Sequence, residues 1–152
     1  MSIMNNSWLM MLSAMILIAC HGTRPQGLGV TDGRLAPCPT SRNCVSSQAP
    51  DEDHRVTSLS FTGPADDAMK KLKEIVRSLP RTAIITTTDT YLHAEFTSFV
   101  FRFTDDVEFL ANDTDKVIHV RSASRLGSSD VGVNRKRIEL IRKLWYEIPL
   151  AP

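Results

Sequence analysis

The stretch TAIITTTDTYLHAEFTSFVFRFTDDVEFLANDTDKVIHVRS, residues 82–122, decides the fold. Apolar and polar residues alternate along most of it, which is the pattern of β-strands with one buried face. Over residues 91–97 one face holds Leu92, Ala94 and Phe96, and the other holds Tyr91, His93 and Glu95. Turn-forming residues at 88–90 and 112–113 separate successive segments, and such short connections favour an antiparallel meander.

The same alternation sets the expected strands, which are residues 82–88, 91–97, 99–109 and 116–122, with a further strand at 56–61. In the third of these, Phe99, Phe101 and Phe103 alternate with Val100, Arg102 and Thr104. The charged pair Asp105–Asp106 then interrupts the apolar pattern, and we expect a β-bulge at this point.

Two amphipathic helices complete the predicted domain. One begins at Pro64, a residue favoured in a first helical turn, and ends at Pro80. The other runs from about Val131 to Glu147. We therefore expect an α+β fold in which an antiparallel sheet of about five strands carries two helices packed on one face, as a two-layer sandwich. The second sheet face is then open, or partly open, to a ligand or partner.

The composition limits the class of protein. The 152 residues fit one domain, and a content of 42% hydrophobic and 23% charged residues is ordinary for a globular protein. A net charge of +1 argues against a general nucleic-acid binder, because no overall positive charge attracts the phosphates. Any electrostatic function therefore depends on local clusters of charge.

The first 19 residues have the features of an export signal. They contain no charged side chain, and the apolar run Trp8–Ala19 is too short to span a bilayer comfortably. Leu17-Ile18-Ala19-Cys20 resembles the lipobox of bacterial lipoproteins, in which the cysteine receives a diacylglyceryl group and becomes the new N-terminus. We predict a signal peptide at residues 1–19 and a lipid anchor at Cys20. The alternatives are an uncleaved membrane anchor and a simple signal peptide.

The residues that follow Cys20 bear on location. An Asp after the cysteine usually retains lipoproteins of double-membraned bacteria in the inner membrane, so His21 slightly favours the outer membrane, with the domain facing the periplasm. Residues 20–36 contain Gly, Pro and Thr without periodicity, and we expect a lipidated N-terminus and flexible tether there. The single folded domain is then expected over residues 37–150.

Cys38 and Cys44 are the two cysteines left for the domain. An exported domain meets an oxidising compartment, so we predict a disulfide between them. A metal pair and two free thiols are the alternatives, although two cysteines with no further Cys or His nearby do not complete a zinc site. We predict no metal and no cofactor.

The segment before the last helix is the candidate binding region. Residues 121–143 hold seven Lys or Arg against two acids, and they lead into a helix N-terminus, where free N–H groups favour an anion. The candidate ligand-binding residues are Arg121, Ser122, Ser124, Arg125, Asn134 and Arg135. The alternative is structural. Asp130 caps the helix, and the basic run pairs with an acidic run made of Asp105, Asp106, Glu108, Asp113 and Asp115.

A catalytic site is the second possibility for the sheet. His93 and Glu95 share a strand face and form a candidate acid–base pair, which Asp105 and Asp106 extend to a hydrolase or transferase site near Arg121 and Arg125. A histidine beside a carboxylate is more often a structural pair. The acids near residue 105 lack the Gly-punctuated loop of a known calcium motif. We lean toward a protein that is not an enzyme.

Three segments together resemble a known family: residues 38–48, residues 91–109 and the long segment Arg121–Arg137. They are similar to the family catalogued as domain of unknown function 1499, which occurs in bacterial envelope proteins and in photosynthetic eukaryotes. The resemblance covers about Pro37 to Trp145 and brings no activity with it. We therefore expect a membrane-anchored envelope lipoprotein whose domain binds an anionic envelope ligand or a protein partner.

Overall fold

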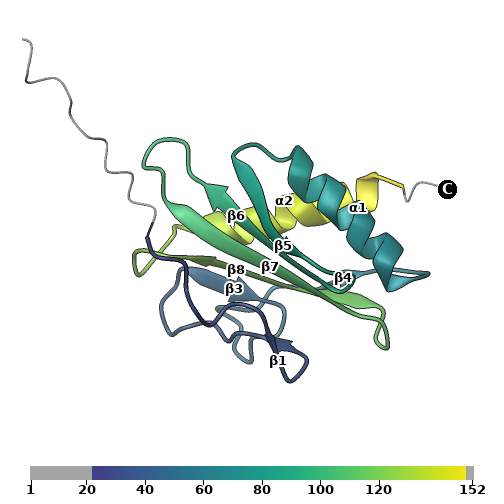
Figure 1. Ribbon diagram of the computed structural model, residues 1–152. Helices are drawn as coiled ribbons and strands as arrows, with labels where there is room; N and C mark the ends of the chain where they lie inside the picture. Colours follow the sequence, from purple (N-terminus) through teal and green to yellow (C-terminus); the bar gives the residue numbers. More distant parts are fainter. Residues whose placement is uncertain (1–21, 150–152) are drawn as a thin grey trace, which may run out of the picture.

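The computed structural model describes residues 22–149 (Figure 1). The leader and Cys20 lie outside this range. The elements, in chain order, are β1 (Val30–Thr31), β2 (Arg34–Leu35), β3 (Cys44–Ser46), β4 (Leu59–Ser60), α1 (Ala65–Ser78), β5 (Thr82–Thr87), β6 (Tyr91–Thr97), β7 (Thr104–Asn112), β8 (Val117–Ser124) and α2 (Val133–Glu147). No helix within the described range is both long and apolar enough to cross a membrane. The predicted α+β class is confirmed.

A six-stranded antiparallel sheet forms the centre of the domain. Its order is β3-β8-β7-β6-β5, and β4 pairs with the part of β8 that β3 leaves free. The predicted meander is confirmed for β5 to β8. Register places Val107 of β7 opposite Ala94 of β6 and opposite Ser122 of β8, so these three side chains share one face.

Both helices cover that face (Figure 1). Helix α1 buries an apolar stripe at helical spacing, and α2 buries Ile138, Ile141 and Trp145. They pack on alternate strand residues, which are Leu92, Ala94, Phe96, Val107, Phe109, Ile118 and Val120. This burial of apolar surface is the main stabilising contribution to the fold. Val133, the first residue of α2, is 46% exposed.

The prediction of a strand at residues 99–103 is wrong, because β7 begins at Thr104. Residues 98–103 form the loop between β6 and β7, closed by a 2.8 Å hydrogen bond from Ser98 N–H to the Phe103 carbonyl. The predicted bulge at Asp105–Asp106 is also wrong, since β7 keeps an unbroken register through both residues. The irregularity in this sheet lies in β5, between Ile84 and Thr86. The strand expected at 56–61 is reduced to β4.

The part of the expected tether that the structure describes, residues 22–36, packs against the domain. Residues 22–36, with the β1–β2 pair, lie against the sheet face opposite the helices (Figure 1). Leu35 is buried, and its N–H donates to the side-chain oxygen of Gln48 at 2.9 Å. We call residues 22–36 the covering segment. It makes the second face of the sheet partly enclosed rather than open.

Candidate functional site

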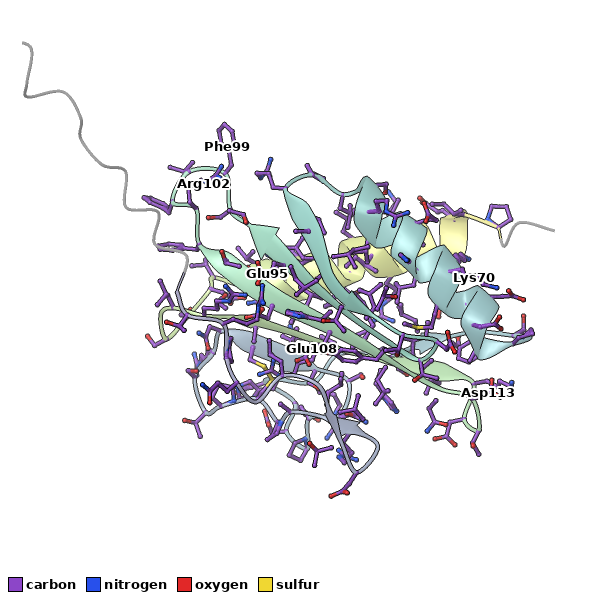
Figure 2. The ribbon with its side chains drawn as sticks, in the orientation of Figure 1. Lys70, Glu95, Phe99, Arg102, Glu108 and Asp113 are labelled. Carbon is purple, nitrogen blue, oxygen red and sulfur yellow. A yellow bond between two sulfur atoms is a disulfide. The ribbon has the colours of Figure 1, made fainter. Side chains whose placement is uncertain are left out.

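A group of buried charged side chains occupies the second face of the sheet. Strand alternation turns His93 and Glu95 of β6 away from the helices, beside Asp106 and Glu108 of β7. Arg121 of β8 lies opposite Glu108, and Arg125 follows at the end of β8. These side chains, together with Tyr91, form the buried charged network (Figure 2 labels Glu95 and Glu108).

Asp106 is the centre of one half of this network. His93 Nε2 lies 2.9 Å from Asp106 Oδ1, and Arg125 donates from Nε to Oδ2 at 2.8 Å and from Nη2 to Oδ1 at 2.7 Å. Arg125 also donates to Glu95. Burial opposes ionisation of both carboxyls, but the guanidinium hydrogen bonds outweigh it and lower the pKa of Asp106 and of Glu95. The same bonds raise the pKa of Arg125. Asp106, Glu95 and Arg125 therefore form an ionised cluster.

Glu108 is the centre of the other half, and its side chain is completely buried. It accepts hydrogen bonds from the Tyr91 hydroxyl at 2.8 Å, from Arg121 Nη1 at 3.1 Å and from the Gly29 N–H at 2.7 Å. Burial, with the nearby Glu108 carboxylate, raises the pKa of Tyr91. Tyr91 therefore stays a protonated donor to Glu108.

The covering segment closes the network from outside. Arg24 donates from Nε and Nη2 to Glu95 Oε1 at 2.8 and 2.6 Å. Gly22, at φ +60°, packs so closely on Arg125 that a Cβ there would meet the arginine Cβ at 2.9 Å. Three carboxylates thus face three guanidiniums (those of Arg24, Arg121 and Arg125), and the charges balance.

Asp105 does not belong to this network, although the sequence grouped it with Asp106. Adjacent strand residues point to opposite faces, and Asp105 pairs with Arg137 of α2 at 2.5 Å. Beside it, the fully buried Asn134 accepts from Ser122 at 2.5 Å and donates to the Asn43 carbonyl at 3.0 Å and the Ser124 hydroxyl at 2.9 Å. These contacts fix the start of α2 on the sheet.

The candidate ligand-binding residues are therefore already engaged. Arg121 and Arg125 pair with carboxylates, and Arg135 donates to the main-chain carbonyls of Arg55 and Asp53, each at 2.7 Å. Asp130 accepts from the N–H groups of Gly132 and Asn134, as a helix cap does. Nε of Arg121 is buried and has no partner within residues 22–149. This geometry favours a structural role for the basic residues at 121–143 over a role in binding an anion.

The network brings together some, but not all, of the candidate catalytic residues. One ligand atom from each of His93, Glu95 and Asp106 lies within 4.8 Å of the others, a spacing that a metal ion would fit. Both carboxylates, however, accept hydrogen bonds from Arg125, and Glu95 also accepts from Arg24, so a cation there would meet two guanidiniums. His93 is 3% exposed and Asp106 1% exposed, which leaves Glu95 as the member nearest to solvent.

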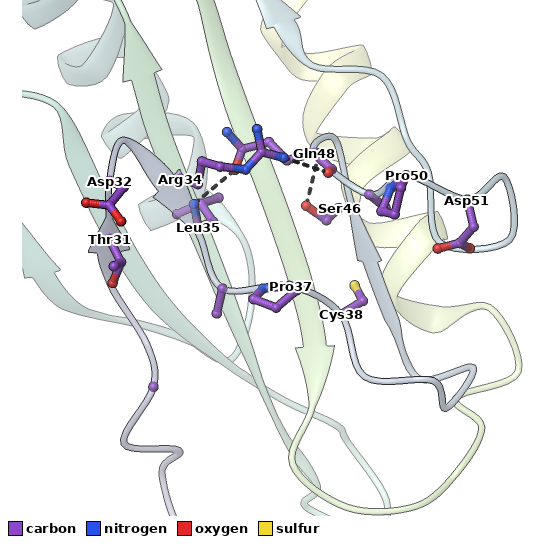
Figure 3. Close-up of a pocket in the computed structure, with 13 residues that line it drawn as sticks. Thr31, Asp32, Arg34, Leu35, Pro37, Cys38, Ser46, Gln48, Pro50 and Asp51 are labelled. Atoms are coloured by element: carbon purple, nitrogen blue, oxygen red, sulfur yellow. Dashed lines mark hydrogen bonds between the residues drawn. The ribbon is translucent and has the colours of Figure 1, made fainter.

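The predicted disulfide is confirmed. Cys38 and Cys44 are bonded, with their Cα atoms 5.6 Å apart. The bridge helps to shape a hollow of about 630 Å³ between residues 27–38 and residues 46–51, which we call the strap groove (Figure 3). Gln48 spans its floor, accepting from the Leu35 N–H and receiving a 3.1 Å hydrogen bond from Arg34 on its main-chain oxygen. The sequence does not predict this groove, because residues 20–36 show no periodicity that would indicate docking on the sheet.

Residues 34–144 match the family model described as protein of unknown function (DUF1499). The chain belongs to this family. The match begins at Arg34, inside the covering segment, so the domain that the DUF1499 model describes includes β2 and the groove residues near it. A search of the curated proteins returns no match.

Proposed function

We propose that this protein is an envelope lipoprotein, anchored through Cys20, whose DUF1499 domain is a non-catalytic module that binds a protein partner in the strap groove. The apolar leader and the lipobox-like residues before Cys20 support the anchor. The Cys38–Cys44 bridge supports an oxidising compartment. The observation that carries the binding proposal is the groove itself, a hollow of about 630 Å³ whose lining includes exposed residues on both walls, such as Thr31 and Pro50.

The lining of the strap groove fits a polypeptide better than an anion. Its centre is apolar, with Leu35, Ala36 and Pro37 on one side and Ala49 and Pro50 on the other. Its charged lining residues are Asp32, Arg34 and Asp51, so carboxylates outnumber guanidiniums and an anionic ligand gains no net attraction. An apolar centre with charges of both signs at the edge is the usual composition of a protein–protein contact.

Site-specific photocrosslinking in the native envelope tests the binding proposal. A photoreactive residue is placed at Thr31 or at Pro50, on opposite walls of the groove, and a control is placed at Glu74 on the exposed side of α1. We expect both groove positions to yield the same crosslinked protein, identified by mass spectrometry, and Glu74 not to yield it. Equal crosslinking from all three positions, or none from the groove, would contradict the proposal.

Mass spectrometry of the purified protein tests the anchor separately. Processing at Cys20 removes residues 1–19 and adds acyl chains, such as palmitate, whose mass is measured directly. Cys20→Ser prevents the modification, and we expect that variant to leave the membrane fraction. An unmodified Cys20 in a chain that keeps Met1 would contradict the envelope location.

A hydrolase or transferase is the second candidate function, and the convergence of His93, Glu95 and Asp106 is the observation that favours it. Such a site requires the covering segment to lift, because His93 and Asp106 are enclosed as they stand. Hydrolysis of an envelope ester or amide that is lost in His93→Gln, with the unfolding free energy little changed, would establish this function in place of the first.

A further inference from the structure

The loop between β6 and β7 exposes an unusual amount of apolar surface. Of its six residues, Ser98–Phe103, four are large apolar side chains: Phe99 is 76% exposed, Val100 72%, Phe101 69% and Phe103 42%. Single exposed apolar residues are common, but four consecutive or nearly consecutive ones in one loop mark a contact surface. Figure 2 shows Phe99 at the outer tip, pointing away from the sheet and both helices.

The loop holds these side chains in a defined arrangement. Phe103 N–H donates to the Ser98 hydroxyl at 2.9 Å, which adds to the main-chain bond that closes the loop. The rings of Phe101 and Phe103 stack with their centroids 5.6 Å apart. Arg102 adopts a left-handed conformation, with φ 57°, which L side chains rarely take. The apolar tip is therefore a built feature of the hairpin.

The loop lies beside the point where the described chain begins. Gly22 packs on Arg125, and the Arg125 N–H donates to the carbonyl of Thr104 at 3.3 Å, directly after Phe103. The described chain therefore begins at the same end of the domain as the aromatic tip. The proposed anchor residue, Cys20, is two residues earlier in the sequence, and two residues of chain span at most about 7 Å.

The charges around the loop suit a lipid surface. Residues 98–103 contain no acid, and Arg102 is an exposed base within them. Arg81 stands beside the loop with its guanidinium 5.5 Å from the centre of the Phe99 ring. Aromatic rings flanked by basic side chains bind the boundary between headgroups and acyl chains, with added attraction to anionic lipids.

We propose that the β6–β7 loop inserts Phe99, Val100 and Phe101 into the lipid surface to which Cys20 is anchored. The loop is the second attachment point of the domain, and it fixes the orientation in which the strap groove is presented. The inference rests on the proposed function in one respect, the acyl anchor at Cys20. The tip protrudes beside the proposed anchor, and for this reason the bilayer fits it better than a partner protein or a second copy of the chain.

Tryptophan fluorescence in vesicles tests this proposal with the full chain, processed by an exporting host. Phe101→Trp reports from the tip, and Asp113→Trp reports from the β7–β8 turn at the opposite end of β7 (Figure 2). The 9 residues of β7 that separate the two sites span about 30 Å. Vesicles contain phosphatidylethanolamine and phosphatidylglycerol, with or without brominated acyl chains. The emission of the unaltered chain, which keeps the buried Trp145, is subtracted from that of each variant.

We expect the added emission of the Phe101→Trp variant to shift to the blue and to be quenched several-fold by brominated lipid. The Asp113→Trp variant should show neither change. If the new indole at position 101 is not quenched by brominated lipid, in a chain whose acyl mass is verified, the proposal is overturned. A blue shift without lipid that grows with protein concentration assigns the loop to self-association instead.

Two further measurements keep the test decisive. Val100→Trp is the second probe, should the substitution at Phe101 disturb the ring stack. If Cys20 carries no acyl group, the proposed function fails. Quenching of the Phe101→Trp variant by added vesicles then decides the loop proposal alone.

Discussion

The main-chain N–H of Gly29 donates a 2.7 Å hydrogen bond to Oε1 of Glu108, a carboxylate with no solvent exposure of its own. A buried carboxylate requires several donors, and here one of them comes from the segment that leads to Cys20 rather than from the sheet. Arg24 makes the equivalent contact to Glu95. The buried charged network therefore helps to attach the covering segment to the sheet.

Removing the Glu108 carboxylate should be strongly destabilising. Glu108→Ala leaves the Arg121 guanidinium buried without its counter-charge and frees the donors of Tyr91 and Gly29. Loss of one partner from a buried pair costs about 3–5 kcal/mol in unfolding free energy. Urea denaturation followed by circular dichroism measures it. Glu74→Ala, which removes an exposed partner of Arg77, is the control and should cost less than about 1 kcal/mol.

A double variant separates the charge from the packing. Glu108→Leu with Arg121→Met replaces the pair by apolar side chains of similar size, and such replacements are often neutral or stabilising. We expect the double variant to recover the stability that Glu108→Ala loses through the unpaired Arg121 charge, but not the part lost through the freed Tyr91 and Gly29 donors. A double variant as unstable as the single one would show that the pair is needed for more than charge neutralisation.

Stability should fall in acid through Asp106 and Glu95. Their pKa values in the folded protein are below the ordinary 3.8 and 4.5, so their contribution is fully present above about pH 4.5 and is lost as pH falls through the folded values. Urea midpoints measured from pH 6 to pH 3 should decline at the acidic end. Glu95→Gln should reduce that slope, while Glu52→Gln on the surface should not. If the unaltered protein and Glu95→Gln lose stability equally steeply in acid, the acid sensitivity does not come from the buried charged network.

The disulfide should make a moderate contribution. Cys38 and Cys44 are six residues apart, and closing so short a loop in the unfolded chain contributes about 2 kcal/mol. Cys38→Ser with Cys44→Ser should lower the free energy of unfolding, measured by urea denaturation, by about that amount and leave the fold unchanged. The same double variant should weaken groove crosslinking, since Cys38 lines the groove. A variant with wild-type crosslinking would separate the bridge from the binding surface.

Asn134 should be the most sensitive residue at the start of α2. Asn134→Leu leaves the Asn43 carbonyl and the Ser122 hydroxyl with fewer buried partners. Each unsatisfied buried group costs about 1–3 kcal/mol. Lys136→Ala, two residues further on the exposed side of the helix, should change the unfolding free energy by less than about 0.5 kcal/mol. If both variants lose a similar amount of unfolding free energy, the loss comes from a change in helix propensity and not from the hydrogen bonds of Asn134.

Local periodicity predicted most of the fold. The apolar stripe of α1 and the alternation along β6 are short-range patterns, and both place their residues as expected. The same rule failed at Phe99–Phe103, where alternating aromatics imitate a strand although the chain must turn there. No Gly or Pro marks the turn, because Arg102 takes the left-handed conformation.

Long-range pairing explains what the sequence could not predict. Asp105 and Asp106 interrupt an apolar pattern locally, yet each continues β7 because an arginine distant in sequence neutralises it, Arg137 on one face and Arg125 on the other. Strand alternation was enough to predict that His93 and Glu95 share a face. The presence of two cysteines in an exported domain was enough to predict the disulfide between Cys38 and Cys44. The strap groove was not, because docking of Leu35 and Gly29 depends on side chains in other elements.

The most direct test of the account is amide hydrogen exchange at Gly29, followed by NMR in the full processed chain. The account predicts that this N–H is protected well beyond an unstructured peptide, and that Glu108→Ala abolishes the protection while Glu74→Ala does not. Exchange at the rate of a free peptide in the unaltered protein would contradict it. Glu108 would then not hold the covering segment on the sheet at Gly29.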